Sequence, residues 1–476
     1  MRETKLSPLR LIAFVSPEAP FAALLMAVVV FVPPFYAGTV GLGLSTVGLI
    51  FGLTKLWDVI TDPAFGVLSD RWHTKWGRRL PWLVASVPVL GLSIYMVFVP
   101  GASVGGVYFA FWMILLYIGW TIGSVSHIAW AAELSADYHE RSRISAYKQG
   151  AALIGSLGLI MLIALSESVL GTDDAGRMAT IAIALLVTLP LTIAAALWAV
   201  PEPITHISAT SPSNGTVRHL VRNQPLRRLL VANLLIGVAT GGAAGMVLFY
   251  VEDVLQLGSW SSFVLVPFLF SGLLFLPLFM RLGRRIGKHQ TLCYALFYQM
   301  GASVLYLVLP AGSAWIAGVA FLLLGAMQAV GAFIPRAIMA DVTDMDTAQS
   351  GKLQSGLYMS LLQSTSKIGA ALAIGLSYPV LSLVGFDPSP GAINSDSALF
   401  GLRVIMVAFP GVTLSVVIWV MWTFPLDEKR QIAFRTQIAT ARAKTMEGTS
   451  SAVTPTPTAP NATADLGVGD VSNPAG

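Results

Sequence analysis

Cysteine is almost absent from this chain, because Cys293 is the single one among 476 residues. One cysteine excludes an intramolecular disulfide framework and gives no support for a thiolate metal cluster. Charge is scarce too, since Asp, Glu, Lys and Arg make up 11% of the residues, roughly half of what soluble domains carry. The sequence also lacks an HExxH motif and a phosphate-binding glycine loop. These absences argue against a secreted disulfide-rich protein and against an enzyme, and we expect no cofactor.

Long apolar runs fill the chain instead. Hydrophobic residues make up 55% of it, and the mean hydropathy is +0.73. Runs of about 20 apolar residues are long enough to cross a bilayer as helices. The sequence therefore predicts an all-α integral membrane protein whose surroundings are lipid. The twelve expected spans are 18–36, 45–69, 80–99, 107–134, 146–165, 179–200, 229–251, 261–280, 292–309, 315–339, 357–384 and 399–424.

A polar stretch divides these spans into two groups of six. We expect an N-terminal half over 1–200, a linker over 201–228 and a C-terminal half over 229–440. The final segment, 441–476, is rich in Thr, Pro, Ala and Gly, so we expect it to be a disordered tail.

Positive charge gathers at alternate ends of the spans. Most of the 29 Lys and Arg lie in the two termini, the linker and alternate loops, whereas the opposite loops hold only Arg177 and Arg403. Cytoplasmic loops of membrane proteins carry such an excess. We therefore expect an inner-membrane protein with both termini in the cytoplasm. Topology explains the net charge of +5, so we expect no nucleic-acid partner. We expect a monomer.

Two carboxylates interrupt the second span. Asp58 and Asp62 are four residues apart, which places them on one face of a helix, one turn from each other. Charge at membrane depth is costly and usually faces a water-filled cavity. The two acids outnumber the nearby Lys55, and a monovalent cation, Na⁺ or H⁺, would neutralise the excess. The Thr61 hydroxyl is a further candidate oxygen ligand for Na⁺. A purely structural ion pair with Lys55 is the alternative.

Other polar or aromatic side chains at membrane depth are candidates for substrate binding or coupling. For each there is a simpler alternative: snorkelling or a topological role for a lysine, and packing for a histidine or an aromatic ring. The candidates are Lys55, Ser124, His127, Trp130, Lys148, Tyr358 and Lys367.

A charged cluster borders the basic loops of the first half. We expect its members to form ion pairs that latch the two halves in the outward-open state rather than to contact substrate. They are Asp70, Arg71, Arg78, Arg79, Glu133, Asp137, Arg141 and Arg143.

Four sequence features resemble the glycoside–pentoside–hexuronide:cation symporters, the melibiose permease-like family of the major facilitator superfamily. They are WDVITDP at 57–63, WGRRLPW at 76–82, AELSADYHERSR at 132–143, and Lys367. The resemblance implies a fold of two pseudo-symmetric six-helix halves. It also implies cation binding by Asp58 and Asp62, with Lys367 close to them and Lys148 opening the fifth helix.

The chain departs from the sugar-binding members at two positions. Those members carry acids on helices one and four, where the expected alignment places Ala22 and Ser124. We therefore expect a symporter for a glycoside or hexuronide-type solute, with an acidic sugar favoured over a simple galactoside. The alternatives are a transporter of a lipid-like or other small organic solute, and a non-transporting membrane receptor on the same fold.

Overall fold

The computed structural model describes residues 6–71, 74, 77–101, 104–134, 138–201, 222–350, 355–426, 433–434 and 436. Within these ranges the chain is helical and contains no strand beyond one isolated bridge between Thr74 and Gly77. The expected all-α architecture is confirmed. Most of the expected linker and the whole tail beyond 440 lie outside the described residues.

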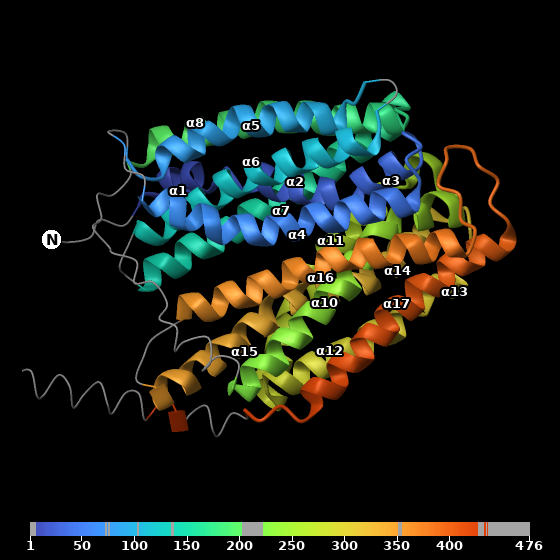
Figure 1. Ribbon diagram of the computed structural model, residues 1–476. Helices are drawn as coiled ribbons and strands as arrows, with labels where there is room; N and C mark the ends of the chain where they lie inside the picture. Colours follow the sequence, from blue (N-terminus) through green and yellow to red (C-terminus); the bar gives the residue numbers. More distant parts are fainter. Residues whose placement is uncertain are drawn as a thin grey trace, which may run out of the picture.

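The first half contains eight helical segments that make up six spans (Figure 1). The first span is broken twice, because Ser16 and Pro17 separate its first two segments and Phe31 separates the next two. The segments are α1 (Pro8–Val15), α2 (Glu18–Val30), α3 (Val32–Ala37), α4 (Leu44–Arg71), α5 (Leu80–Phe98), α6 (Gly106–Glu133), α7 (Tyr138–Leu170) and α8 (Asp174–Ala199).

The second half repeats this plan with more interruptions. Its segments are α10 (Gln224–Phe249), the π-helix η1 (Tyr250–Val254), the short η2 (Gly258–Trp260), α11 (Leu265–Ile286), α12 (Lys288–Ser303), α13 (Leu305–Val308), α14 (Ala314–Leu324), α15 (Met327–Ser350), α16 (Ser355–Leu383) and α17 (Asp396–Trp422).

Eleven stretches of the described chain are long and apolar enough to cross a membrane. The tenth expected span, 315–339, is instead divided between α14 and α15. Gly325 lies at the break, where a Cβ atom would be 2.1 Å from the carbonyl oxygen of Phe268 in α11. The close approach of α11 explains why this span bends at a glycine.

Apolar side chains cover the outside of the bundle. On α8, Ile183, Val187 and Leu191 are four residues apart and more than half exposed. This spacing forms a stripe on one helix face, as expected for a surface that contacts lipid tails.

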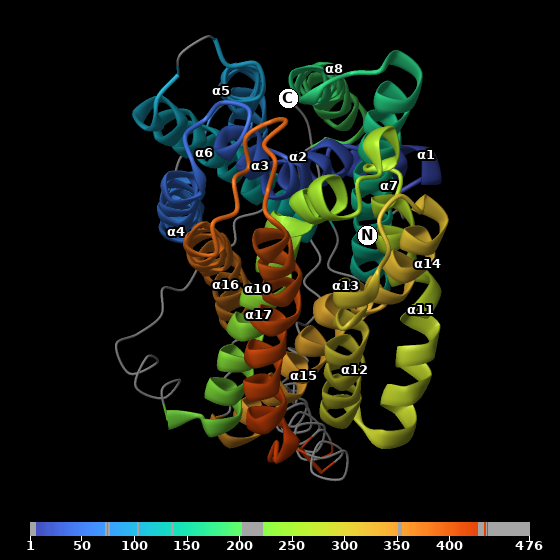
Figure 2. The same ribbon diagram turned by 90° about the vertical axis from the view of Figure 1, so that its right-hand side faces the viewer.

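The two halves meet along α4 and α16 and separate toward one end (Figure 1). We call that end, which carries Arg78, Arg79 and the start of α10, the basic side, and the end that carries α3 the far side. Figure 2 shows the molecule from the far side, where α4 lies against α16. Gly48 permits this contact, since a Cβ there would be 2.9 Å from Cβ of Tyr378.

Candidate functional site

Asp58 and Asp62 share one partner from the other half of the molecule. The ammonium nitrogen of Lys367 on α16 lies 3.0 Å from Oδ2 of Asp58 and also contacts Oδ2 of Asp62. Asp58 is fully buried, and the Asp62 side chain is 25% exposed. One helical turn between the two acids lets both reach the same ammonium group.

A second donor comes from α6. The Thr121 hydroxyl lies 2.7 Å from Oδ1 of Asp62 and 3.1 Å from Oδ1 of Asp58, so it donates to the carboxylate pair from the opposite side. Sequence reasoning missed Thr121, because one threonine in an apolar span carries no signal of its own.

Lys55 and Lys367 also lie over aromatic rings. Lys55 Nζ is 3.9 Å from Oδ2 of Asp58 and 4.5 Å from the centre of the Tyr117 ring. Lys367 Nζ is 4.7 Å from the centre of the Trp120 ring. Ring faces attract cations, and this attraction helps to hold the ammonium groups away from bulk water. Two lysines therefore balance the charge of the two acids.

Thr61 does not join this group in the present conformation. Its hydroxyl donates a 3.2 Å hydrogen bond to the main-chain oxygen of Asp58. The role of Thr61 as a cation ligand stays a prediction.

A second polar cluster lies nearby, formed by Glu18 of α2, His127 of α6 and Lys148 of α7. Glu18 Oε1 is 2.9 Å from Nδ1 of His127 and 2.7 Å from Nζ of Lys148. The structure thus brings together two of the predicted candidates through an acid that sequence reasoning did not select.

The break in the first span builds this cluster. Proline at position 17 cannot continue the helical hydrogen bonds of α1, so carbonyl groups near the break need other donors. The Ser16 hydroxyl donates to the oxygen of Ala13 at 2.8 Å, and Nε2 of His127 lies 2.8 Å from the oxygen of Phe14. The same break starts α2 at Glu18.

The first span contributes an acid to this region. Ala22 was placed at the position of the helix-one acid, but Glu18 lies one turn earlier on the same helix face.

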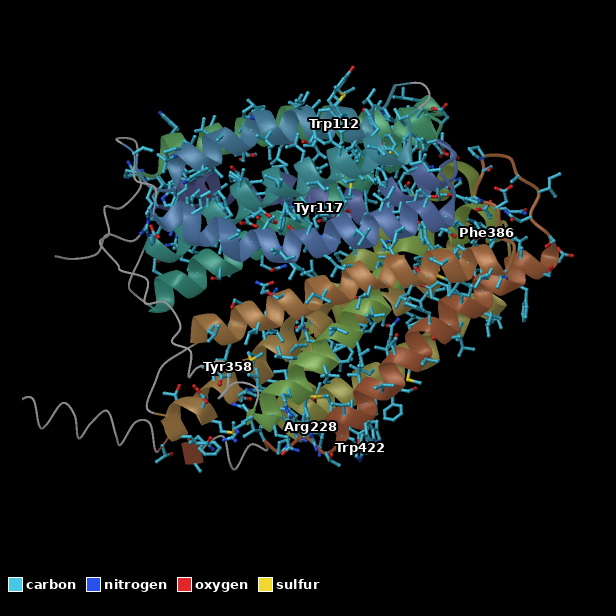
Figure 3. All side chains as sticks on the ribbon, in the orientation of Figure 1. Trp112, Tyr117, Arg228, Tyr358, Phe386 and Trp422 are labelled. Carbon is cyan, nitrogen blue, oxygen red and sulfur yellow. The ribbon has the colours of Figure 1, made fainter. Side chains whose placement is uncertain are left out.

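The remaining candidates differ in their surroundings. Ser124 is buried on α6 between Thr121 and His127, and its hydroxyl has no hydrogen-bond partner among the described residues. Trp130 is fully buried, with its ring edge-on to Phe14 at 4.9 Å. The structure does not bring Tyr358 to this region, because it is buried in the second half toward the basic side (Figure 3).

The charged residues of the basic side pair within the first half. Arg78 and Arg79 both bind Glu133, and Nη2 of Arg79 lies 3.0 Å from Oε1 of Glu133. Arg143 binds Glu140 and the main-chain oxygen of Leu6. Asp137 and the side chains of Asp70, Arg71 and Arg141 lie outside the described residues. The expected latch between the halves stays a prediction.

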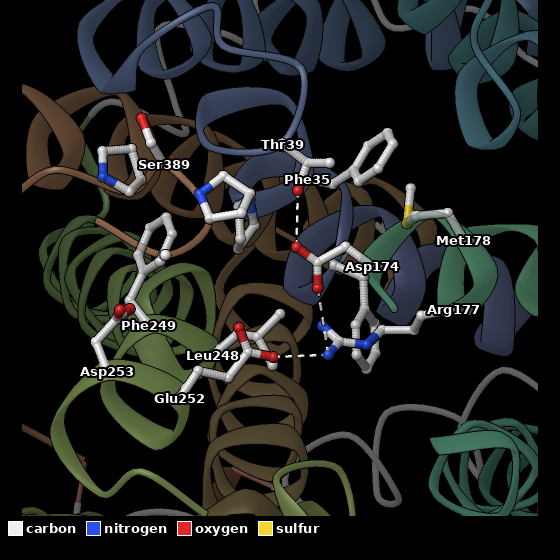
Figure 4. Close-up of a pocket in the computed structure, with 15 residues that line it drawn as sticks. Phe35, Thr39, Asp174, Arg177, Met178, Leu248, Phe249, Glu252, Asp253 and Ser389 are labelled. Atoms are coloured by element: carbon white, nitrogen blue, oxygen red, sulfur yellow. Dashed lines mark hydrogen bonds and ion pairs between the residues drawn. The ribbon is translucent and has the colours of Figure 1, made fainter. Parts of the chain in front are cut away.

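On the far side, an ion pair does join the two halves (Figure 4). Arg177 of α8 lies 2.7 Å from Glu252 of η1 and 2.5 Å from Glu167 of α7. Ser262 of the second half donates to the same Glu167 oxygen at 2.9 Å. Arg177 and Glu252 border a pocket of about 270 Å³. Sequence reasoning noted Arg177 only as an isolated charge.

Comparisons with known proteins agree with this architecture. The family described as MFS/sugar transport protein matches residues 13–428. The chain is similar to the glucuronide carrier protein homolog of Escherichia coli, with 23% identity over 414 residues that cover 84% of this chain and 88% of the relative. It is also similar to the sodium-dependent lysophosphatidylcholine symporter 1-B of Danio rerio, with 22% identity over 446 residues, 84% of this chain and 81% of the relative.

A solved structure shares the fold. A mutant of the nucleoside transporter NupG superposes with a TM-score of 0.67 at 10% identity, over 87% of this chain and 99% of that one. The family and the relatives are transporters and not enzymes. The expected resemblance to symporters of the major facilitator superfamily is confirmed.

Proposed function

Since the chain belongs to the MFS/sugar transport protein family, we propose that it is a cation-coupled symporter for an acidic sugar of the hexuronide type. The observation that carries this proposal is the ion pair of Lys367 with Asp58 and Asp62, because it joins the two halves at one buried and one partly exposed acid.

Lys367 occupies the carboxylates in the conformation described here. A Na⁺ ion or a proton that binds Asp58 and Asp62 takes over the role of this ammonium group. Once the acids are neutralised, α16 is no longer tied to α4 through this ion pair. Cation binding then changes the relative stability of the two arrangements of the halves, which is the requirement for coupling in a transporter that works by alternating access.

Charge balance favours an anionic substrate. Asp58 and Asp62 are matched by Lys55 and Lys367, so one bound cation leaves one positive charge in excess. An uncompensated charge in a desolvated site is unfavourable, and a carboxylate on the sugar would pair with the lysine that the cation released. The similarity to a glucuronide carrier homolog agrees with this choice.

Two polar groups of α6, the helix that contributes to both clusters, have no hydrogen-bond partner among the described residues. The Ser124 hydroxyl and the indole nitrogen of Trp120 are buried atoms that have no hydrogen-bond partner among the described residues. Both side chains belong to α6, which contributes Thr121 to one cluster and His127 to the other. We assign Ser124 and Trp120 to the sugar hydroxyls and the ring face, because they match the mixed polar and apolar surface of a sugar.

The positive-inside rule places the basic side in the cytoplasm. The chain is then an inner-membrane protein whose halves are joined on the outer side by Arg177 and Glu252. This arrangement corresponds to a state that faces inward.

Uptake into proteoliposomes tests the substrate class and the coupling ion together. Purified protein would be given labelled glucuronide, methyl-galactoside or lysophospholipid, with an imposed Na⁺ or H⁺ gradient. We expect gradient-driven accumulation of the glucuronide and weak uptake of the galactoside. Uptake of the galactoside without inhibition by glucuronide would overturn the assignment of an acidic sugar.

A lipid-like solute is the second candidate. The observation in its favour is the similarity to a lysophosphatidylcholine symporter over most of both chains. Sodium-dependent uptake of lysophospholipid, with no uptake of either sugar, would select it.

A further inference from the structure

Both ring nitrogens of His127 face oxygen atoms that accept hydrogen bonds. Nε2 lies 2.8 Å from the main-chain oxygen of Phe14, and Nδ1 lies 2.9 Å from Oε1 of Glu18. A carbonyl oxygen is an acceptor only, so Nε2 must carry a hydrogen. The ring of His127 is fully buried.

A neutral imidazole carries one N–H, which the Phe14 contact uses. The lone pair of Nδ1 would then face a carboxylate oxygen at hydrogen-bond distance, and this arrangement is repulsive unless one more proton is present. The extra proton is either on Nδ1, giving an imidazolium beside the Glu18 carboxylate, or on Glu18, which then donates to Nδ1.

We propose that Glu18 and His127 together bind one exchangeable proton, at a site separate from Asp58 and Asp62. Thr121 and His127 are six residues apart on α6, so the two sites are about 9 Å apart along that helix. The proton site is thus built into the same helix that contributes a hydroxyl to the cation site.

Lys148 controls how firmly the pair holds this proton. Among the residues that the structure describes, it is the other charged group in contact with Glu18, and it contacts the same oxygen as His127. The rings of Phe14 from α1 and Trp130 from α6 pack against the imidazole and bring no charge to the site. A positive charge at Lys148 opposes the proton, while its withdrawal strengthens the bond between Glu18 and His127.

A sugar hydroxyl that accepts a hydrogen bond from Lys148 and draws it away from Glu18 would therefore favour proton binding. Substrate and proton then bind cooperatively, because each reduces the cost of binding the other. This consequence rests on the proposed transport of an acidic sugar, whereas the presence of the proton on the pair does not.

Nitrogen NMR of the full-length protein in lipid nanodiscs tests the site without transport. The chain has six histidines, and His127→Gln assigns the signal of this one in protein labelled with ¹⁵N-histidine. The spectra would be recorded at pH 7.5, where ordinary histidine is mostly neutral. His289→Gln, which changes a histidine at the start of α12, is the matched control and should leave the signal in place.

We expect an imidazolium signal for His127, or a neutral ring together with an infrared band from protonated Glu18 that disappears in Glu18→Gln. A neutral ring beside an ionised Glu18 would overturn the proposal. In Glu18→Gln the amide can donate to Nδ1, so the extra proton is no longer needed, and His127 should become neutral. Asp58→Asn should leave the His127 signal unchanged, so a failure of the proposed cation site can be recognised separately.

Discussion

Lys367 of α16 and Asp58 of α4 lie 309 positions apart in the sequence, yet their charged atoms are 3.0 Å apart. This ion pair connects the two halves of the transporter at membrane depth. In the mechanism that we propose, Lys367 competes with a coupling cation for the same oxygens, so the affinity for the cation and the contact between the halves depend on each other.

Replacing Lys367 with Gln should increase the affinity for the coupling cation. The cation no longer has to displace an ammonium group, so we expect the half-saturating cation concentration to fall about tenfold or more, equivalent to ~1.4 kcal/mol. The turnover rate should fall as well, because the cation is released more slowly. Initial uptake rates at varied Na⁺ and pH measure both quantities.

Lys55→Met is the control for Lys367→Gln. Lys55 lies farther from Asp58, at 3.9 Å, so its effect on cation affinity should be smaller. A higher half-saturating concentration in Lys367→Gln would contradict competition between lysine and cation.

Removing the Thr121 hydroxyl should weaken cation binding. Thr121 orients both carboxylates, and one hydrogen bond contributes about 0.5–1.5 kcal/mol, so Thr121→Val should raise the half-saturating cation concentration about two- to tenfold. Thr61→Val is the matched control, because the Thr61 hydroxyl donates to a main-chain oxygen in this conformation. Equal effects of the two changes would instead favour Thr61 as a direct cation ligand.

Breaking the ion pair of the far side should favour the arrangement that is open there. Arg177→Gln removes the contact with Glu252, and a shift of ~1 kcal/mol changes a two-state population about fivefold. We expect Met178→Cys, at a buried position that lines this pocket, to react at least about fivefold faster with a thiol reagent. The measurement uses a Cys293→Ala background, since Cys293 is the single native cysteine.

Arg403→Gln is the control for this experiment. Arg403 also lies toward the far side, but it donates to main-chain oxygens within the second half, including that of Leu309. Faster labelling in both variants would indicate general loosening and would argue against Arg177 as a contact that holds the halves together.

Thiol labelling of intact cells also tests the orientation. An impermeant reagent should label Ser389→Cys on the far side and should not label Gly215→Cys in the expected linker. The reason is the positive-inside distribution of Lys and Arg. Labelling of Gly215→Cys without permeabilisation would reverse the assignment of the two sides.

The sequence was sufficient to predict the membrane-spanning helices and the helix face that carries the two acids. Apolar runs predicted the spans, and the spacing of Asp58 and Asp62 predicted that they lie on one helix face and could bind one cation. The identity of that partner came from the resemblance, because no local pattern relates Lys367 to residues on a distant helix. The interruption at Gly325 was not predicted, since it depends on how closely α11 approaches.

The second cluster shows why a site between helices is harder to predict. Glu18 follows Pro17 at the start of a segment, where an acid is ordinary and its side chain has no obvious direction. Only the packing of α6 and α7 against α2 shows that His127 and Lys148 both reach it. Thr121 was missed for the same reason.

Accumulation by Asp58→Asn in proteoliposomes is the most direct test of the central claim, which is that the buried acids couple cation binding to transport. The variant lacks one negative charge of the pair while its shape is kept, and breaking a buried pair costs about 3–5 kcal/mol. We predict that cation-driven accumulation of glucuronide is abolished, whereas exchange of substrate down its gradient continues. Accumulation with an unchanged dependence on the cation would contradict the account and would make Asp58 a structural residue.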